Sequence, residues 1–229
     1  MRTLREAFLW GKEKLKKYSV ESPAIKPAIE ARILLSYVLG ISYEQMITHD
    51  DKLLGKEEFA RYDELLGLRC KGMPVQYITG QQEFMSLNFH VTPDVLIPRP
   101  DTEILVEEAI QEASLMDKPL IIVEIGTGSG AIALSLAHYI KDAQVHTIDI
   151  SPKAIEIARK NAKNLSLEEK VIFHQGDLLS PIKGILDGKV DILVSNPPYI
   201  PSKDILSLQR EVQFHEPSLA LDGGIEGLD

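Results

Sequence analysis

The chain has 229 residues, of which 44% are hydrophobic and 26% charged, a balance typical of a folded globular protein with one or two domains. Its net charge of -9 argues against non-specific nucleic-acid binding, because few cations could displace the counterions of a phosphate backbone. One cysteine, Cys70, excludes an internal disulfide and a cysteine-based zinc cluster, so no metal is expected and a cytoplasmic location is favoured. No stretch reaches transmembrane length, and no membrane contact is expected.

Residues 1–75 are predicted to form a small bundle of helices. Capping-box spacing, a first-turn proline and apolar residues at helical spacing place four helices in this region. These helices begin near Thr3, Pro27, Ser42 and Lys56. Gly40 ends the second of them, because glycine readily adopts the left-handed conformation found after a helix.

Residues 76–100 are predicted to link two domains. Apolar and polar residues alternate on both sides of Met85 and Ser86, which predicts a β-hairpin. A stiff proline-rich stretch follows the hairpin. It leads into a helix that is predicted to be capped by Asp101 or Thr102 and to end near Met116.

From Pro119 onward, strand patterns alternate with helix patterns, which predicts a parallel sheet with right-handed crossovers. The predicted strands cover residues 120–125, 145–150, 171–174 and 190–194, with a fifth near 219–221. Helices at residues 131–140 and 152–165 separate the first three strands. Residues 101–229 are therefore predicted to form one α/β domain.

The first of these strands runs into a glycine-rich turn, Gly126 to Gly130, that opens a helix. This turn also fits a dinucleotide-binding unit, with Asp149 as the acid about 20 residues further on. Three features favour S-adenosylmethionine instead, in the order found in class I methyltransferases. Glu124 stands two residues before the first glycine, Asp149 ends the second strand, and Asp177 with Leu178 follows the third.

Asn196-Pro197-Pro198-Tyr199 follows the fourth strand. The two prolines stop the strand and prevent a helix from starting, so an amide and an aromatic ring are held on a stiff turn. In open α/β sheets, ligands bind at this carboxyl end of the strands. The motif therefore predicts a pocket for a planar substrate group that carries an NH2.

Taken in this order, the motifs resemble the release factor glutamine methyltransferases of the HemK/PrmC family over essentially the whole chain. The most specific matching segments are residues 74–80, 83–84, 96–103, 124–131, 194–201, 216–217 and 220–224. Ser86 stands where the family pattern has glycine, a small change at a turn. The resemblance implies a Rossmann-like class I methyltransferase sheet, an N-terminal helical bundle domain and a linking β-hairpin.

The resemblance also implies the activity, which is N5-methylation of the glutamine in the Gly-Gly-Gln motif of class I peptide chain release factors. The methyl donor would be S-adenosyl-L-methionine, and the product S-adenosyl-L-homocysteine. Cofactor binding would fall to Glu124, Gly126, Thr127, Gly128, Ser129, Gly130, Asp149, Asp177, Leu178 and Asn196. Residues Asn196, Pro197, Pro198 and Tyr199 would hold the substrate glutamine, and Asn196, Pro197 and Tyr199 would act in catalysis. Residues 1–75 would dock the release factor, without direct contact to nucleic acid.

Two further expectations concern the end of the chain and the rival functions. The family continues with a helix and two more strands, so we expect these 229 residues to be part of a longer protein. Such a fragment should keep its cofactor site, be less stable and associate through an open sheet edge. The rival functions are an N6-adenine or N4-cytosine methyltransferase, which would need a basic groove and base flipping, a non-catalytic cofactor-binding scaffold, and a dehydrogenase.

Overall fold

The computed structural model of the protein describes residues 2–19 and 25–228, and the chain divides into two compact units. The first unit contains residues 1–79 together with residues 207–215, and the second contains residues 80–206 and 216–229. The functional division at residues 75 and 100 stays a prediction. The compact units follow a different division, because a short segment late in the sequence folds with the N-terminal helices.

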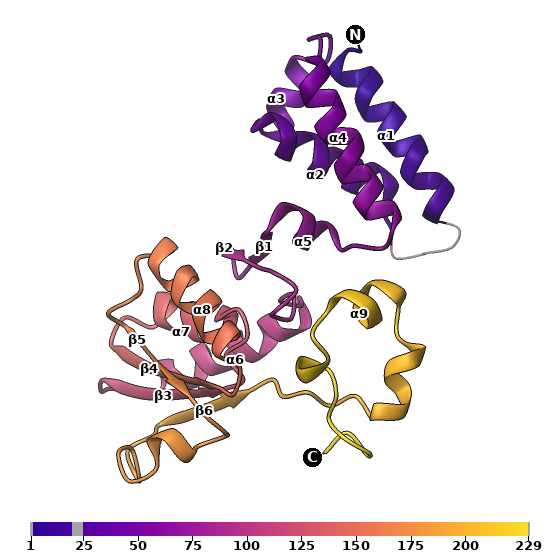
Figure 1. The fold of residues 1–229 in the computed structure, drawn as a ribbon. Helices are drawn as coiled ribbons and strands as arrows, with labels where there is room; N and C mark the ends of the chain where they lie inside the picture. The colour runs from indigo at the N-terminus through magenta and orange to yellow at the C-terminus, as the bar shows by residue number, and fades with distance from the viewer. Residues whose placement is uncertain (1, 20–24, 229) are drawn as a thin grey trace. The chain divides into compact units, whose positions relative to one another are not determined.

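The first unit is helical (Figure 1). Its helices are α1 (Leu4–Ser19), α2 (Pro27–Leu39), α3 (Tyr43–Thr48), α4 (Lys56–Cys70), α5 (Val75–Thr79) and α9 (Arg210–His215). The predicted capping box of α1 is confirmed, since the Glu6 amide donates to the Thr3 hydroxyl at 3.1 Å. Gly40 follows α2 with a φ of 62°, as predicted for a helix end.

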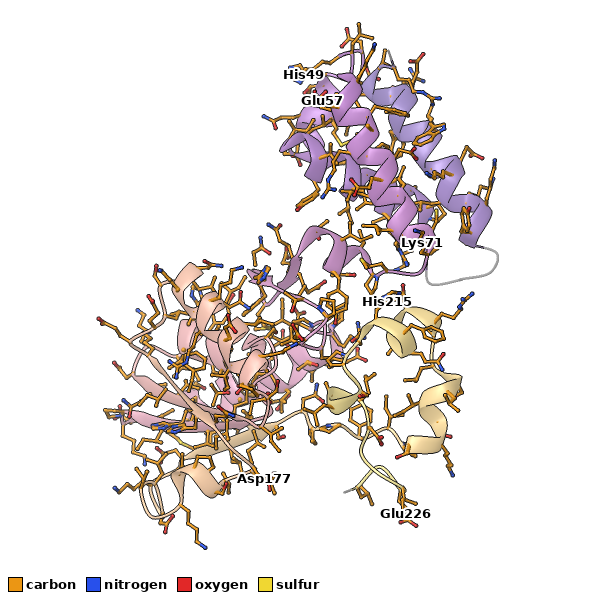
Figure 2. All side chains as sticks on the ribbon, in the orientation of Figure 1. His49, Glu57, Lys71, Asp177, His215 and Glu226 are labelled. Atoms are coloured by element: carbon orange, nitrogen blue, oxygen red, sulfur yellow. The ribbon has the colours of Figure 1, made fainter. Side chains whose placement is uncertain are left out.

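Leucine and other apolar side chains from α1, α2 and α4 form the core of this first unit. Gly11 lies in the middle of α1 because a Cβ there would stand 2.0 Å from the hydroxyl of Tyr62. That hydroxyl donates to the Ala31 carbonyl at 2.9 Å, which ties α4 to α2. Figure 2 labels Lys71, just after α4, and His215, the last residue of α9, which belong to this same unit.

The second unit is built around a four-stranded parallel sheet in the order β5-β4-β3-β6 (Figure 1). Its strands are β3 (Leu120–Ile125), β4 (Ala143–Asp149), β5 (Val171–Gln175) and β6 (Ile192–Ser195). Its helices are α6 (Asp101–Ser114), α7 (Ala131–Tyr139) and α8 (Pro152–Asn164), with 3-10 turns at Ser180–Ile182, Ser202–Ser207 and Ser218–Ala220. The predicted parallel sheet is confirmed. Its strand order changes direction between β3 and β6, where ligands bind in such sheets.

Helices α6, α7 and α8 supply the apolar side chains that cover one face of this sheet. On the other face, Val123 and Ile148 pack against Ile182 and Leu186 from the segment after β5. Strand β3 is therefore covered on both sides, as its nearly continuous apolar sequence predicts.

The predicted β-hairpin is confirmed as β1 (Gln81–Phe84) and β2 (Leu87–His90). Its turn residues, Met85 and Ser86, have φ values of 48° and 59°, so the chain takes a left-handed turn without glycine. Phe84 and Phe89 are buried and contribute to the core formed with α6 and α7. The hairpin is therefore an integral part of the second unit.

Two local predictions are wrong. The expected strand near residues 219–221 is a 3-10 turn at Ser218–Ala220, in which the amide of Ala220 donates to the carbonyl of Pro217. Only one parallel bridge forms there among the described residues, between Ile200 and Asp222. The expected cap of α6 is also wrong, because the helix already begins at Asp101 and the cap position is Pro100, which has no capping side chain.

In the described parts of the chain, no helix combines the length and the apolar composition needed to span a membrane.

Candidate functional site

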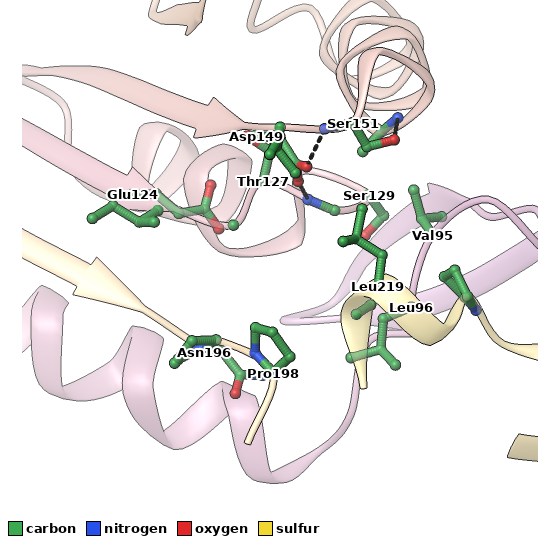
Figure 3. Close-up of a pocket in the computed structure, with 18 of the residues that line it drawn as sticks. Val95, Leu96, Glu124, Thr127, Ser129, Asp149, Ser151, Asn196, Pro198 and Leu219 are labelled. Atoms are coloured by element: carbon green, nitrogen blue, oxygen red, sulfur yellow. Dashed lines mark hydrogen bonds between the residues drawn. The ribbon is translucent and has the colours of Figure 1, made fainter. Parts of the chain in front are cut away.

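A cavity of about 550 Å³ opens in the second unit at the carboxyl ends of β3, β4 and β6 (Figure 3). Its walls come from the glycine-rich turn after β3, the ends of β4 and β5, the turn after β6 and the segment after β2. Eleven of the predicted site residues line it: Glu124, Gly126, Thr127, Gly128, Ser129, Asp149, Asp177, Leu178, Asn196, Pro197 and Pro198. The fold therefore gathers motifs that are spread over about 75 residues of sequence.

The conformation of the glycine-rich turn depends on its glycines. Gly126, Gly128 and Gly130 all have positive φ values, which side-chain-bearing residues rarely adopt. Gly130 does not line the cavity. A Cβ at this position would stand 3.1 Å from that of Ala158, so this glycine lets α7 begin tightly against α8. The turn is fixed by a hydrogen bond from the Gly126 amide to the Ile148 carbonyl at 2.8 Å.

Asp149, at the end of β4, holds the same turn from the side. Its Oδ2 accepts the Gly128 amide at 2.8 Å, and its Oδ1 accepts the Ser151 amide at 2.9 Å. Each carboxylate oxygen keeps a further lone pair, and the side chain is half-buried at the cavity wall. Asp149 can therefore accept hydrogen bonds from a ligand while it orders the loop.

Glu124 is a buried acid at the base of the cavity, with only 1% of its surface exposed. Its Oε2 accepts the Thr147 hydroxyl at 2.5 Å, and that hydroxyl also lies 2.6 Å from the hydroxyl of Thr127. Among the described residues, no donor reaches Oε1. Burial, and then the negative charge of Asp149, raise the pKa of Glu124 to about 8, against the lowering effects of the Thr147 hydrogen bond and, more weakly, of the Ala133 backbone N–H.

The turn after β6 forms the opposite wall. The side-chain NH2 of Asn196 donates to the Thr102 hydroxyl of α6 at 3.2 Å, which leaves the amide oxygen available. Pro197 is exposed and Pro198 half-buried. Tyr199 is 66% exposed and does not line the cavity.

Residues 221–223 pair with the backbone that follows this turn. The Ile200 amide donates to the Leu221 carbonyl at 3.1 Å, and the Gly223 amide donates to the Ile200 carbonyl at 2.9 Å. A Cβ on Gly223 would stand 2.8 Å from the Pro198 carbonyl oxygen, so glycine is needed for this approach. Leu219, Ala220 and Asp222 of the returning segment also line the cavity.

Asp177 and Leu178 lie where β5 ends, and both are exposed at the cavity rim. Figure 2 shows Asp177 on the segment after β5. Leu178 has a φ of 45°, a strained conformation for a leucine that presents its side chain at the surface. An apolar side chain and a carboxylate beside each other suit the face and the amino edge of a flat heterocycle.

Thr102 was missed as a site residue by the sequence analysis, which assigned it only to a helix cap. Its contact with Asn196 joins residues 94 positions apart, and no local pattern encodes such a pair. Arg99, Leu96 and Ser151 also line the cavity without having been predicted. Arg99 forms an ion pair with buried Glu216, a residue of the matching segment at 216–217.

Comparisons with known proteins agree with these features. Residues 6–80 match the family described as PrmC N-terminal domain, and residues 101–214 match the methyltransferase small domain. A release factor glutamine methyltransferase from Moorella thermoacetica is 43% identical over 227 residues, which are 99% of this chain and 77% of the relative. One from Geobacter sulfurreducens is 42% identical over 227 residues, which are 99% of this chain and 76% of the relative.

A solved structure of a SAM-dependent methyltransferase from Agrobacterium tumefaciens is similar over 52% of this chain and 39% of its own length. Its sequence identity is 21% and its TM-score 0.44, a partial likeness. The two sequence relatives, by contrast, match nearly the whole chain.

Proposed function

Because the chain belongs to the release factor glutamine methyltransferase family, we propose that it methylates the N5 side-chain nitrogen of a glutamine in class I peptide chain release factors, with S-adenosyl-L-methionine as methyl donor. The target glutamine is that of the Gly-Gly-Gln motif. One observation carries the proposal. A buried acid with a free oxygen, a glycine turn and an Asn-Pro-Pro turn border a single cavity.

The residues of the cavity fit S-adenosylmethionine. The unpartnered Oε1 of Glu124 lacks a donor among the described residues, and an ammonium group such as that of a methionine moiety would supply one. The glycine turn leaves room for that moiety, and Asp149 has lone pairs for the two ribose hydroxyls. Asp177 and Leu178 would flank the adenine. When bound, this cofactor supplies an electrophilic methyl group on a sulfonium centre.

The substrate amide would be held by the turn after β6. The side-chain oxygen of Asn196 and the carbonyl of Pro197 would accept its two N–H bonds, and Tyr199 would pack on its plane. The contact from Asn196 to Thr102 supports this role, because it engages the NH2 group of Asn196 and leaves its oxygen for the substrate. No base is required, since the amide proton can leave after the nitrogen has become cationic.

Two physical effects would supply the rate. An amide nitrogen is a poor nucleophile, so orientation matters most, and holding two reactants in attack geometry contributes about 7–11 kcal/mol. Acceptor oxygens around the nitrogen also stabilise the positive charge that develops there. The stiff proline backbone suits both effects, because its carbonyl directions are set before the substrate arrives.

The helices of residues 1–75 would dock the release factor. No constellation of catalytic residues was recognised in this part of the sequence, yet a loop buried in the cavity needs its parent protein held nearby. The full chain should therefore have a much higher kcat/KM for a whole release factor than for a short Gly-Gly-Gln peptide. Equal values for the two substrates would contradict a docking role.

The deciding experiment is radiolabelled methyl transfer with purified release factor and with DNA as parallel substrates. We expect label on the release factor only, and none on a release factor whose Gly-Gly-Gln glutamine is replaced by alanine. Mass spectrometry of the labelled peptide should place the methyl group on the glutamine side chain. Label on DNA, or none on either substrate, would overturn the proposed activity.

A further inference from the structure

Asn161 of α8 is a polar side chain with no exposed surface, and its role is not given by any motif. Its Oδ1 accepts the His90 amide at 2.8 Å. Its Nδ2 donates to the His90 carbonyl at 2.9 Å and to the Ser129 carbonyl at 2.8 Å. Because the partners are one N–H and two carbonyls, only this orientation of the side-chain amide satisfies all three.

These three hydrogen bonds join two walls of the cavity. Ser129 belongs to the glycine-rich turn, and it lines the cavity. His90 ends β2, and the backbone that follows supplies Val95 and Leu96 to the same cavity. Figure 3 draws Ser129, Val95 and Leu96 around this one space. The side chain of Asn161 therefore connects segments that are about 40 residues apart in sequence.

The main-chain groups that Asn161 contacts depend on it. His90 donates its amide away from β1, so its backbone N–H and C=O on this side are satisfied by Asn161. Removing the side-chain amide would leave the buried Ser129 carbonyl and the part-buried backbone groups of His90 without these partners, a state that proteins avoid. A second tie from α8, the ion pair of Lys153 with Asp94, is exposed and contributes little.

We propose that Asn161 is a positioning residue that couples the glycine-rich turn to the segment after β2, so that a ligand in the cavity orders both walls together. The proposal rests on the proposed function in one respect, namely that S-adenosylmethionine and its product occupy this cavity. Asn161 itself touches neither ligand nor substrate in this scheme. It acts through Ser129 on one side and through the backbone of His90 on the other.

The first test uses the unmodified protein and amide hydrogen exchange, with S-adenosylhomocysteine as the probe. Binding should slow exchange in the glycine-rich turn, residues 126–131, and also in β2, residues 87–90, although β2 does not line the cavity. In Asn161→Ala the protection should remain in the turn and be lost from β2. Protection confined to residues 126–131 in the unmodified protein would overturn the coupling.

The second test compares Asn161→Ala and Asn161→Asp with the control Asn164→Ala, an exposed asparagine at the end of the same helix. Calorimetric affinity for S-adenosylhomocysteine should fall by about tenfold or more in the Asn161 variants, as expected when buried groups lose their partners. The KM for cofactor should rise while the KM for release factor stays unchanged. Asn164→Ala should match the unmodified protein in every measurement.

The outcomes separate this proposal from the proposed function. A purely structural role would lower the melting temperature of the Asn161 variants and leave their cofactor affinity intact well below melting, which would overturn the positioning role alone. If the unmodified protein fails to bind S-adenosylhomocysteine, the proposed cofactor is wrong and the coupling falls with it. If the variants do not fold, the exchange experiment on the unmodified protein decides.

Discussion

Both compact units bury glutamates, and Glu30 of the helical unit and Glu124 of the sheet unit are surrounded by opposite kinds of partner. In the helical unit, Glu30 of α2 accepts from Arg69 of α4 through both of its oxygens, at 2.7 and 3.3 Å. The same guanidinium reaches Glu211 of α9 at 2.8 Å. In the sheet unit, Glu124 has one hydroxyl partner, and among the described residues no cation or donor reaches its second oxygen.

This difference separates a structural charge from one kept for a ligand. The two charges of a buried ion pair compensate each other, so the contribution of the pair to stability can be measured on the ligand-free protein. A buried carboxyl group without a cation instead holds its proton, and the pKa of Glu124 is raised to about 8 for this reason. The helical unit is complete in itself, whereas the sheet unit carries a site that a positively charged ligand would complete.

The largest expected effect comes from breaking the buried ion pair between Arg69 and Glu30. Arg69→Met leaves buried Glu30 and half-buried Glu211 without their cation, so the helical unit should lose about 3–5 kcal/mol of stability. Trp10, the only tryptophan in the sequence, packs against Phe59 in this unit and reports its unfolding in urea by fluorescence. The control Arg61→Met removes an exposed pair with Glu64 and should cost at most about 0.5 kcal/mol. Equal losses of stability in the two variants would show that the buried ion pair contributes no more than the exposed one.

Substitutions in the cavity of the sheet unit should lower the reaction rate or the ligand affinity more than they lower stability. Asn196→Ala should lower the methylation rate by about 100-fold, or roughly 2.7 kcal/mol, as for the loss of one positioned polar group in a preorganised site. Its affinity for S-adenosylhomocysteine should stay within about twofold, and Asn164→Ala serves as the control. A normal rate of release-factor methylation by Asn196→Ala would remove this residue from the mechanism.

Asp149→Ala addresses the cofactor wall directly. We expect its affinity for S-adenosylhomocysteine to fall by about 1–3 kcal/mol, because hydrogen bonds to a charged acceptor are lost and Gly128 loses its anchor. Isothermal titration calorimetry measures this change. The matched control is Asp142→Ala, an exposed acid just before the other end of β4. Unchanged binding by Asp149→Ala would exclude it from the cofactor site.

The last expected effect is a change in the pH dependence of stability. The folded-state pKa of Glu124 is raised from 4.5 to about 8, so its contribution is fully present below pH 4.5 and is lost as the pH rises through 8. The ligand-free protein should therefore melt at a lower temperature at pH 8.5 than at pH 6. In Glu124→Gln, which cannot ionise, this slope should be shallower.

Differential scanning calorimetry over this range checks the Glu124 prediction. Burial lowers the pKa values of His146, His174 and His215, so their contribution to stability is lost as the pH falls, the opposite direction to that of Glu124. Parallel curves for the two proteins would mean that Glu124 is ionised in the ligand-free state. The comparison between the two glutamates would then fail.

The sequence predicted those parts of the fold that depend on neighbours in the chain. The bounds predicted for β3 match the structure, because a short, nearly continuous apolar run between a proline and a glycine is typical of a buried strand. Gly40 and the Ser42 capping box also work within one turn of helix. The strand predicted near Leu219–Leu221 was wrong because three apolar residues are too few to distinguish a strand from a tight turn.

The candidate site was predictable to the same extent. The eleven predicted residues that line the cavity were found through motifs that span a few positions, such as the glycine-rich turn. Thr102 and Asn161 were missed because their partners lie 94 and 71 positions away. Helix periodicity can mark such residues as inward-facing, but it cannot name the backbone groups that they meet.

The placement of α9 has a consequence for how this protein can be divided. The backbone passes between the two units at three points, after residues 79, 206 and 215. A single cleavage at the first of these points would leave residues 1–79 attached only through non-covalent contacts with residues 207–215, and a fragment beginning at residue 80 would carry Glu211 without Arg69. Removing the helices by truncation would leave residues 207–215 without the unit that they fold with, so point substitutions are the cleaner way to probe the helical unit.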